Sequence, residues 1–252
     1  MKYHKPNPQL YWGDNINSLR SVFFLFFLLI SFISYSQQQP FNGSLLYIST
    51  HPASLSVDTT RVYFSADKIL LTYSPGDTVR SAYKRLADLK TGKQYWMNEQ
   101  HTIALVESIR DERKLRNFER LPGKARIQGR ECRVYFSDIV ILGKEEKEHY
   151  THKLWVGDTM LVNSSRPDLY LAGFGIYDGK LIIKKENEYI PDINKMESIK
   201  TTLILMETKT EELPAEFFVI PAHFRQEKFT QPKFFEYITH EDVDGILLLT
   251  GI

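Results

Sequence analysis

Short stretches in which apolar and polar residues alternate run along most of the chain, and they predict β-strands. The clearest stretch is residues 131–136, where Cys132, Val134 and Phe136 would share one face of a strand. A polar turn follows, and residues 150–156 are apolar and aromatic again. We therefore expect two antiparallel strands here, at the middle of an all-β sheet.

The same pattern recurs with turns at intervals of roughly 8–12 residues, which is typical of a meandering sheet. It predicts further strands in residues 45–48, 61–65, 68–73, 79–86, 94–98, 102–107, 180–185, 200–208 and 245–252. Residues 200–208 are apolar on both faces and should be covered on both sides. The apolar strand 245–252 should pair with the sheet, because a free apolar edge promotes aggregation. Residues 110–120 are highly charged and predict a solvated loop or a short helix.

The first part of the chain predicts an export signal, residues 1–36, ahead of a single antiparallel β domain, residues 37–252. Lys2, Lys5 and Arg20 precede an apolar run of about 12 residues, against the roughly 20 that a spanning helix needs. Small residues at Ser34 and Ser36 suit a signal peptidase. The alternatives are an uncleaved anchor or a start codon assigned too far upstream. We expect export through the inner membrane to the periplasm or outer envelope, or secretion.

Composition agrees with a packed β protein and excludes one class of partner. Hydrophobic residues make up 42% and aromatic residues 13% of the chain, and aromatic side chains favour sheets. Removing the three basic residues and one acidic residue of the leader changes the formal net charge from +1 to −1. A near-neutral chain lacks the basic surface that nucleic acid requires, so no nucleic-acid partner is expected.

Several sequence segments, in their order, resemble a known family. They are DLKTGKQYW (residues 88–96), IQGREC (residues 127–132), the strand with Trp155 and LILMETKTEELPAEFFVIP (residues 203–221). Over residues 41–224 the chain resembles the GLPGLI family of exported proteins from Bacteroidota. The resemblance implies a fold similar to the LolA/LolB lipoprotein carriers, which is a curved antiparallel sheet forming a half-barrel around an apolar cavity. It brings no catalytic residues.

Residues with possible chemistry have simpler structural explanations. Cys132, the only cysteine, could be a nucleophile, but its place on the apolar face of a strand predicts a packing role. His149 and His152 have a spacing that suits zinc on a helix, whereas on a strand they point to opposite faces. The acidic residues 241–244 lack the full spacing of a calcium loop. We predict no metal site, no cofactor and no catalysis.

Three functions fit these observations. The first is a non-catalytic envelope protein that binds an apolar ligand or lipid inside the curved sheet, where pockets are largely apolar. Candidate wall residues are aromatic, with ordinary core packing as the alternative for each: Phe64, Tyr95, Trp96, Tyr135, Phe136, Trp155 and Phe174. The second is a structural or partner-binding protein of the envelope that uses edge strands or residues 160–179. The third is a hydrolase, for which no Ser, Asp and His spacing provides support.

Two kinds of modification pattern are also present. Residues 58–60, 77–79 and 158–160 each have the Asp-Thr-x form used for O-glycosylation in exported Bacteroidota proteins, and we expect them at exposed turns or strand ends. Residues 42–44 and 163–165 fit an N-glycosylation acceptor, which matters only in a eukaryotic secretory route.

Overall fold

The structure is a computed structural model, and it describes residues 41–50, 56–76, 81–109, 117–142, 147–161, 172–191 and 198–238. The chain divides into two units, Met1–Gln39 and Pro40–Ile252, and all described residues belong to the second. The predicted export signal, the apolar strand 245–252 and the acidic residues 241–244 lie outside the described residues.

The second unit is built mostly from β-strands. The strands are β1 (Gly43–Thr50), β2 (Val57–Phe64), β3 (Lys68–Ser74), β4 (Tyr83–Asp88), β5 (Lys93–Asn98), β6 (Ile103–Ser108), β7 (Glu119–Arg120), β8 (Ala125–Ile127), β9 (Arg130–Leu142), β10 (Lys147–Met160), β11 (Ile176–Tyr177), β12 (Lys180–Pro191), β13 (Ile199–Thr210) and β14 (Arg225–Lys228). The described helical segments are short: η1 (Ala172–Phe174), η2 (Ala215–Phe218) and α3 (Gln231–Tyr237).

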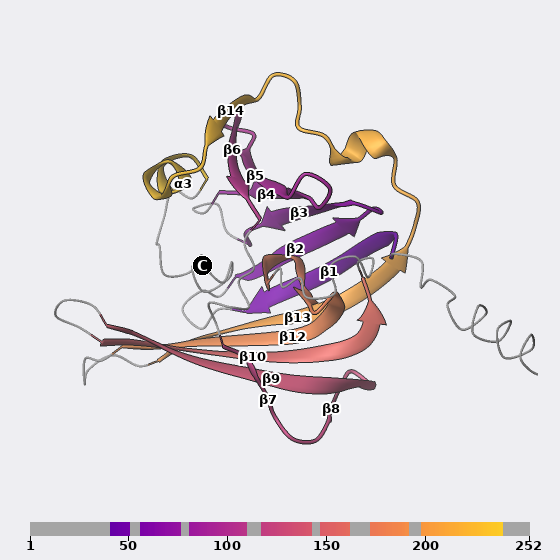
Figure 1. The fold of residues 1–252 in the computed structure, drawn as a ribbon, viewed down its shortest axis with the longest axis vertical. Coiled ribbons are helices and arrows are strands. Elements are labelled where there is room, and N and C mark those ends of the chain that lie inside the picture. The colour runs from indigo at the N-terminus through magenta and orange to yellow at the C-terminus, as the bar shows by residue number, and fades with distance from the viewer. Residues whose placement is uncertain are drawn as a thin grey trace, which may run out of the picture. The chain divides into compact units, whose positions relative to one another are not determined.

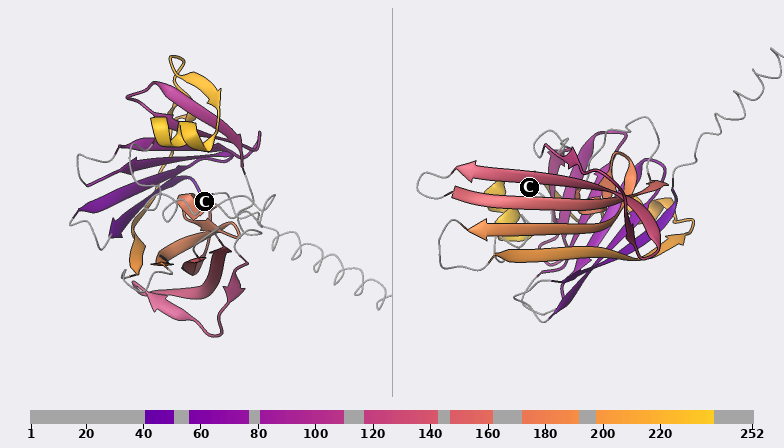
Figure 2. Two further views of the ribbon diagram at one scale, coloured as in Figure 1. Left: turned by 90° about the vertical axis from the view of Figure 1, so that its left-hand side faces the viewer. Right: turned by 90° about the horizontal axis from the view of Figure 1, so that it is seen from below.

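These strands form one curved sheet that is not closed (Figures 1 and 2), so the predicted all-β curved sheet is confirmed. The strand order is β14-β6-β5-β4-β3-β2-β1-β13-β12-β10-β9-β7, with β11 beside β12 and β8 beside β9. Neighbouring strands are antiparallel except β14, which pairs with β6 in parallel. Strands β1 to β6 follow one another as a meander, whereas β1 pairs with β13 from the far end of the chain.

Local chemistry explains the tight turn between β4 and β5. The side chain of Asp88 accepts hydrogen bonds at 3.0 Å from the backbone N–H groups of Lys90 and Thr91. Gly92 then takes a φ of +67°, which glycine adopts without strain. The residue types of this short segment therefore account for the turn.

The two faces of the sheet carry different clusters of buried side chains. The inner face, on which Tyr47 and Trp96 lie, belongs to the largest hydrophobic cluster, and Phe234 of α3 packs against Trp96 in the same cluster. The outer face of β3 to β6 includes Leu86 and Met97, and the segment around η2 packs over it. Because neighbours along a strand point to opposite faces, each of the strands β2 to β6 contributes to both clusters.

Two sequence predictions need correction. The β9–β10 pair is antiparallel as expected, but it lies toward one end of the sheet, and only short β7 and β8 flank the outer side of β9. Strand β13 alternates between buried and exposed residues instead of being covered on both sides, and Met206 is 53% exposed. Beyond the predicted strands, the polar residues 225–228 form β14, and α3 begins at Gln231.

Candidate ligand site

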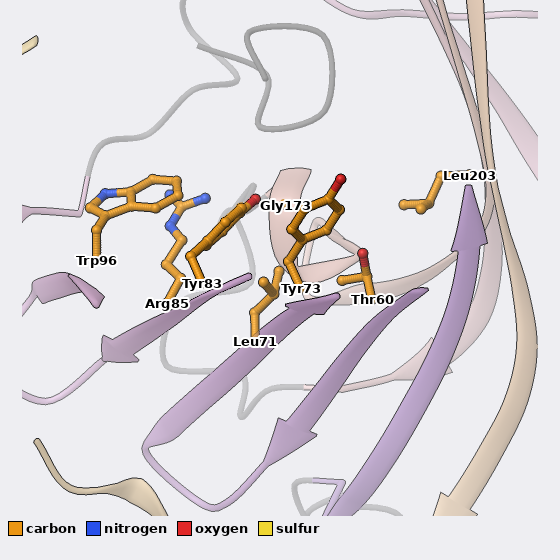
Figure 3. Close-up of a pocket in the computed structure, with 8 residues that line it drawn as sticks. All are labelled: Thr60, Leu71, Tyr73, Tyr83, Arg85, Trp96, Gly173 and Leu203. Carbon is orange, nitrogen blue, oxygen red and sulfur yellow. The ribbon is translucent and has the colours of Figure 1, made fainter. Parts of the chain in front are cut away.

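A small pocket lies on the inner face (Figure 3). We call it the inner pocket, and its lining residues are Thr60, Leu71, Tyr73, Tyr83, Arg85, Trp96, Gly173 and Leu203. The space open to the centre of a water-sized sphere is about 20 Å³, which suits about one water molecule. The inner pocket as it stands is therefore too small for a lipid chain.

The strand register brings most of these side chains together. Arg85 lies opposite both Trp96 on β5 and Leu71 on β3, and side chains directly opposite in a sheet share one face. In the same way, Tyr73 on β3 lies directly opposite Thr60 on β2 and directly opposite Tyr83 on β4. These two rows cross β2 to β5 side by side and make the floor of the inner pocket.

The curvature of the sheet brings Leu203 into the wall of the inner pocket. Leu203 belongs to β13, and strands β1 to β4 separate it from Trp96 on β5 in the sheet order. Both side chains line the same pocket, which requires the sheet to bend toward this face. Gly173 comes from η1, so a segment far along the chain lies over the floor.

Arg85 is the unusual member of the lining because it is a charged residue that is only 1% exposed. Its Cζ atom lies 4.2 Å from the ring centroid of Trp96 and 4.8 Å from that of Phe174. Both distances are in the range of cation–π contacts, which gain strength where water is excluded. Its Nε and Nη2 donate hydrogen bonds of 3.0 and 2.6 Å to the side-chain oxygen of Gln94.

Gln94 links Arg85 to an acidic residue. Its amide nitrogen donates to Glu107 at 2.9 Å, and the indole N–H of Trp96 donates to the same carboxylate oxygen at 2.7 Å. Buried polar groups of this kind are stable only when they are hydrogen-bonded. The network therefore fixes the positions of both Arg85 and Trp96 beside the inner pocket.

Two tyrosines form the centre of the lining. The rings of Tyr73 and Tyr83 stack with centroids 5.0 Å apart, and the Tyr73 hydroxyl donates to Asp58 at 2.9 Å. Burial raises the pKa of Tyr83 to about 12, against an opposing effect of the Arg85 charge. The Tyr83 hydroxyl is therefore a neutral hydrogen-bonding group at physiological pH.

Gly173 allows close packing above the guanidinium. A Cβ atom at this position would lie 2.8 Å from Nη1 of Arg85. Positive φ values occur at Gly175 and Gly179 but not at Gly173, so an alanine at 173 would act only through its contact with the end of the Arg85 side chain. The missing side chain leaves the end of Arg85 against the η1 backbone.

The structure separates the predicted wall residues into different environments. Phe64, Trp96, Trp155 and Phe174 belong to the inner cluster, and Trp96 also lines the inner pocket. Tyr95, next to Trp96 in the sequence, points to the outer face and packs against Leu86 and its neighbours.

The other two predicted wall residues lie elsewhere. Tyr135 packs against Tyr177 with ring centroids 4.4 Å apart, in a separate small cluster with Leu154. Phe136 is half-buried and belongs to none of the three buried clusters. The predicted residues therefore do not form one wall.

Sequence analysis missed most of the actual lining, including Arg85, Tyr83 and Tyr73. One signal was available for Arg85: it alternates with Tyr83 and Ala87 along β4, which places all three on the buried face. A charged residue at such a position marks either a polar network or a binding site. Leu203 and Gly173 had no comparable signal, because their contacts depend on distant strand pairing.

The other chemical candidates occupy separate places. Cys132 is 1% exposed and packs in the inner cluster, so its predicted packing role is confirmed. His152 is buried with Nδ1 2.8 Å from Asn187 Oδ1, whereas His149 is more exposed and pairs with Asp138. Among the described residues, no group of three or more His, Cys, Asp and Glu side chains could hold a metal ion.

The glycosylation candidates differ in accessibility. Thr159 is exposed near the end of β10 and the Asp158 side chain is 65% exposed, which is the predicted environment. In residues 58–60 the acceptor Thr59 is half-buried within β2, and the Asp58 and Thr60 side chains on either side are 2% and 8% exposed, so this triplet is less accessible than predicted. Asn42 is exposed, and the candidates at 77–79 and 163–165 lie outside the described residues.

Comparison with known proteins gives only a distant fold likeness. No protein family matches the chain, and no curated protein matches it. One solved structure that resembles it, of PNGF-II, aligns with a TM-score of 0.47 and 11% identity, over 77% of this chain and 32% of that one. The chain thus spans about a third of that protein's length, and similarity at this level does not extend to function. Within the described ranges, no helix is long and apolar enough to cross a bilayer.

Proposed function

We propose that the protein is an exported, non-catalytic envelope protein that holds an apolar ligand against the inner face of its curved sheet. One observation supports this proposal most: the inner pocket lies among aromatic and aliphatic side chains on the side toward which the sheet bends. Ligand sites are typically concave and mostly apolar, with a few polar groups that fix orientation. Arg85, Tyr83 and Thr60 would be those polar groups.

The size of the inner pocket sets a condition on this function. Space for about one water molecule does not accept an acyl chain, so binding requires lining side chains to move. Leu203 is the lining residue on β13, across the curve of the sheet from Trp96, and its displacement would widen the inner pocket toward β13. We therefore expect the free and bound forms to differ around Leu203.

The test is mass spectrometry of an organic extract of the protein purified from its native host. A stoichiometric apolar molecule is expected with the wild type and should be reduced in Leu203→Phe, which fills the inner pocket. Met206→Phe is the matched control, because Met206 lies on the same strand and is 53% exposed. An extract without a bound molecule, together with no binding of an apolar dye, would contradict the proposal.

A second candidate function is partner binding at the envelope. It is favoured by two exposed apolar side chains near η2, Phe217 at 39% and Val219 at 52% exposure. Exposed apolar residues that lie close together are typical of interaction sites. A pull-down from envelope extract in which Phe217→Ser and Val219→Ser release a specific protein would support this function over the first.

A further inference from the structure

Three arginines lie on one face of the strands at the β7 end of the sheet. Arg120 lies directly opposite Tyr135, and Arg126 lies directly opposite Glu131. Glu131, Arg133 and Tyr135 alternate along β9, so their side chains share one face with those of the residues opposite them. We call the surface formed by Arg120, Arg126 and Arg133 the arginine face. In Figure 1 it belongs to the lower edge of the sheet, where β7 and β8 flank β9.

Two of these arginines have no acidic partner. Arg120 and Arg126 are exposed, and neither forms an ion pair with a carboxylate of the described residues. Glu131, the carboxylate directly opposite Arg126, pairs with Lys124 instead. The charges of Arg120 and Arg126 are therefore available to an anion from outside the chain.

The charge of the third arginine is only partly compensated. Nη2 of Arg133 lies 3.8 Å from Oδ1 of Asp158, and Nζ of Lys180 lies 3.6 Å from the same oxygen. Both distances exceed those of a hydrogen bond, so one carboxylate faces two cations without bonding tightly to either. The Nε atom of Arg133 is also without a hydrogen-bond partner in the described part of the chain.

Cations outnumber carboxylates in this small area. The cations on or beside the arginine face are Arg120, Lys124, Arg126, Arg133 and Lys180, and the carboxylates are Glu131, Asp158 and Asp178. Five cations against three carboxylates leave a difference of +2. The formal net charge of the whole chain is +1, so the remainder of the chain carries a net charge of −1. The positive charge is therefore concentrated at this end of the sheet.

The spacing of the arginines favours an extended anionic surface over a small anion. Alternate positions of a strand are roughly 7 Å apart, so three arginines at positions 131, 133 and 135 of the register are spread along β9 and do not converge on one point. The large apolar side chains that are exposed in the described residues belong to β2, β13 and the segment around η2, not to residues 117–133. The arginine face thus lacks the apolar centre that is typical of a protein interface.

From this arrangement we propose that the arginine face binds the anionic surface of a phospholipid bilayer. Head-group phosphates present many negative charges in one plane, and arginine binds phosphate oxygens through paired N–H donors. Binding of this kind requires neither a pocket nor an exposed apolar side chain. The inference goes beyond the proposed function, because it assigns the protein a second site, at which it meets a membrane, whatever the inner pocket holds.

The test measures co-sedimentation with lipid vesicles at low salt, using protein purified from its native host. Vesicles of phosphatidylglycerol and phosphatidylcholine in equal parts should bind the wild type, whereas vesicles of phosphatidylcholine alone should not. The double variant Arg120→Gln/Arg126→Gln should bind the anionic vesicles about tenfold or more weakly, since each basic residue near an anionic surface contributes to affinity. High salt should also release the wild type, because it screens exposed charges. Equal binding of the wild type to both kinds of vesicle would overturn the inference.

The matched control removes the same charge from another part of the sheet. Lys90→Gln/Lys93→Gln takes two exposed cations from the turn between β4 and β5 and should leave vesicle binding nearly unchanged. Arg120→Lys/Arg126→Lys keeps the charge and should retain most of the binding. A loss in the Lys90/Lys93 variant as large as that in the arginine variant would show that only total charge matters, and would overturn the assignment to the arginine face.

Soluble polyanions separate a bilayer from other acidic partners. Polyglutamate and single-stranded DNA are added to the vesicle assay as competitors, and neither should displace the protein at equal concentration of negative charge. Tighter binding to either polymer than to the anionic vesicles would overturn the inference. The proposed function would stand in that case, because extraction of the inner-pocket ligand tests it separately.

Discussion

Gly175 lies directly against the ring of Tyr47: a Cβ at Gly175 would overlap the Tyr47 hydroxyl oxygen and lie 2.8 Å from the ring carbon that bears it. The same hydroxyl donates a hydrogen bond of 2.8 Å to the backbone oxygen of Ile182. Tyr47 on β1 thereby connects the η1–β11 segment and β12 to the centre of the sheet. This contact positions Gly173 and Phe174, which lie beside Arg85.

Gly175→Ala should lower the free energy of unfolding by about 2–3 kcal/mol or more, because it combines a left-handed backbone at φ +72° with the Tyr47 contact. Gly92→Ala is the matched control, since Gly92 has a φ of +67° and a Cβ there would have no atom within 4 Å. Urea unfolding of both variants measures the difference. Equal losses of unfolding free energy in the two variants would show that the Tyr47 ring can move away from the new Cβ without destabilising the protein.

Stability should fall at alkaline pH in a way that depends on Tyr83. Burial raises its pKa to about 12 in the folded protein, against about 10 in an unfolded chain. The unfolded chain therefore loses this proton first, and the contribution of Tyr83 is complete below about pH 10 and lost as pH rises toward 12. Urea unfolding at several alkaline pH values should show a smaller decline for Tyr83→Phe than for the wild type.

Some of the alkaline decline should remain in Tyr83→Phe. Burial also raises the pKa of Tyr47, so this second tyrosine acts in the same direction. A profile for Tyr83→Phe identical to that of the wild type would contradict the assigned burial.

The thiol of Cys132 should react slowly with a soluble disulfide reagent in the native protein. The residue is 1% exposed, and burial raises the pKa of the thiol, so both access and the thiolate population are low. Adding urea should raise the reaction rate by orders of magnitude. Fast reaction without denaturant would mean that β8 and β9 open readily in solution.

Removing the contact between α3 and the sheet should destabilise the protein strongly. The Phe234 ring packs against the Trp96 ring with centroids 4.9 Å apart and is 3% exposed. Phe234→Ala should lower the free energy of unfolding by about 3 kcal/mol or more, as large-to-small core substitutions do. The neighbouring Phe235 is only half-buried, so Phe235→Ala should cost clearly less in the same urea titration.

Local pattern predicted the strands well because alternation is a property of each strand alone. The period-two pattern at Cys132 and Val134 matches their burial in β9, and the turn at Gly92 follows from its own sequence. The adjacent aromatic residues Tyr95 and Trp96 were both assigned to the ligand wall, although strand geometry sends them to opposite faces. That error could have been avoided from the sequence.

Strand order and the pocket could not be predicted in the same way. The position of β9 toward one end of the sheet depends on which strands pair across long distances, and alternation carries no information about partners. The lining of the inner pocket joins Trp96 to Leu203 through the curvature of the sheet. A search for apolar wall residues by hydrophobic pattern does not find Arg85. Arg85 is nevertheless the one charged residue in the lining of the inner pocket.

The pairing of β1 with β13 has a consequence for how the molecule is assembled. Strands β1 to β6 are joined by short connections and can pair as the chain emerges, but the register Gly43↔Thr210 joins two strands that are far apart in the sequence. Closing so long a loop carries an entropic cost before the contacts form, which slows folding. Until β13 pairs with β1, the inner face of β1 to β5 lacks the wall that Leu203 supplies, so the inner pocket cannot form early and a chain cut short before β13 would lack it.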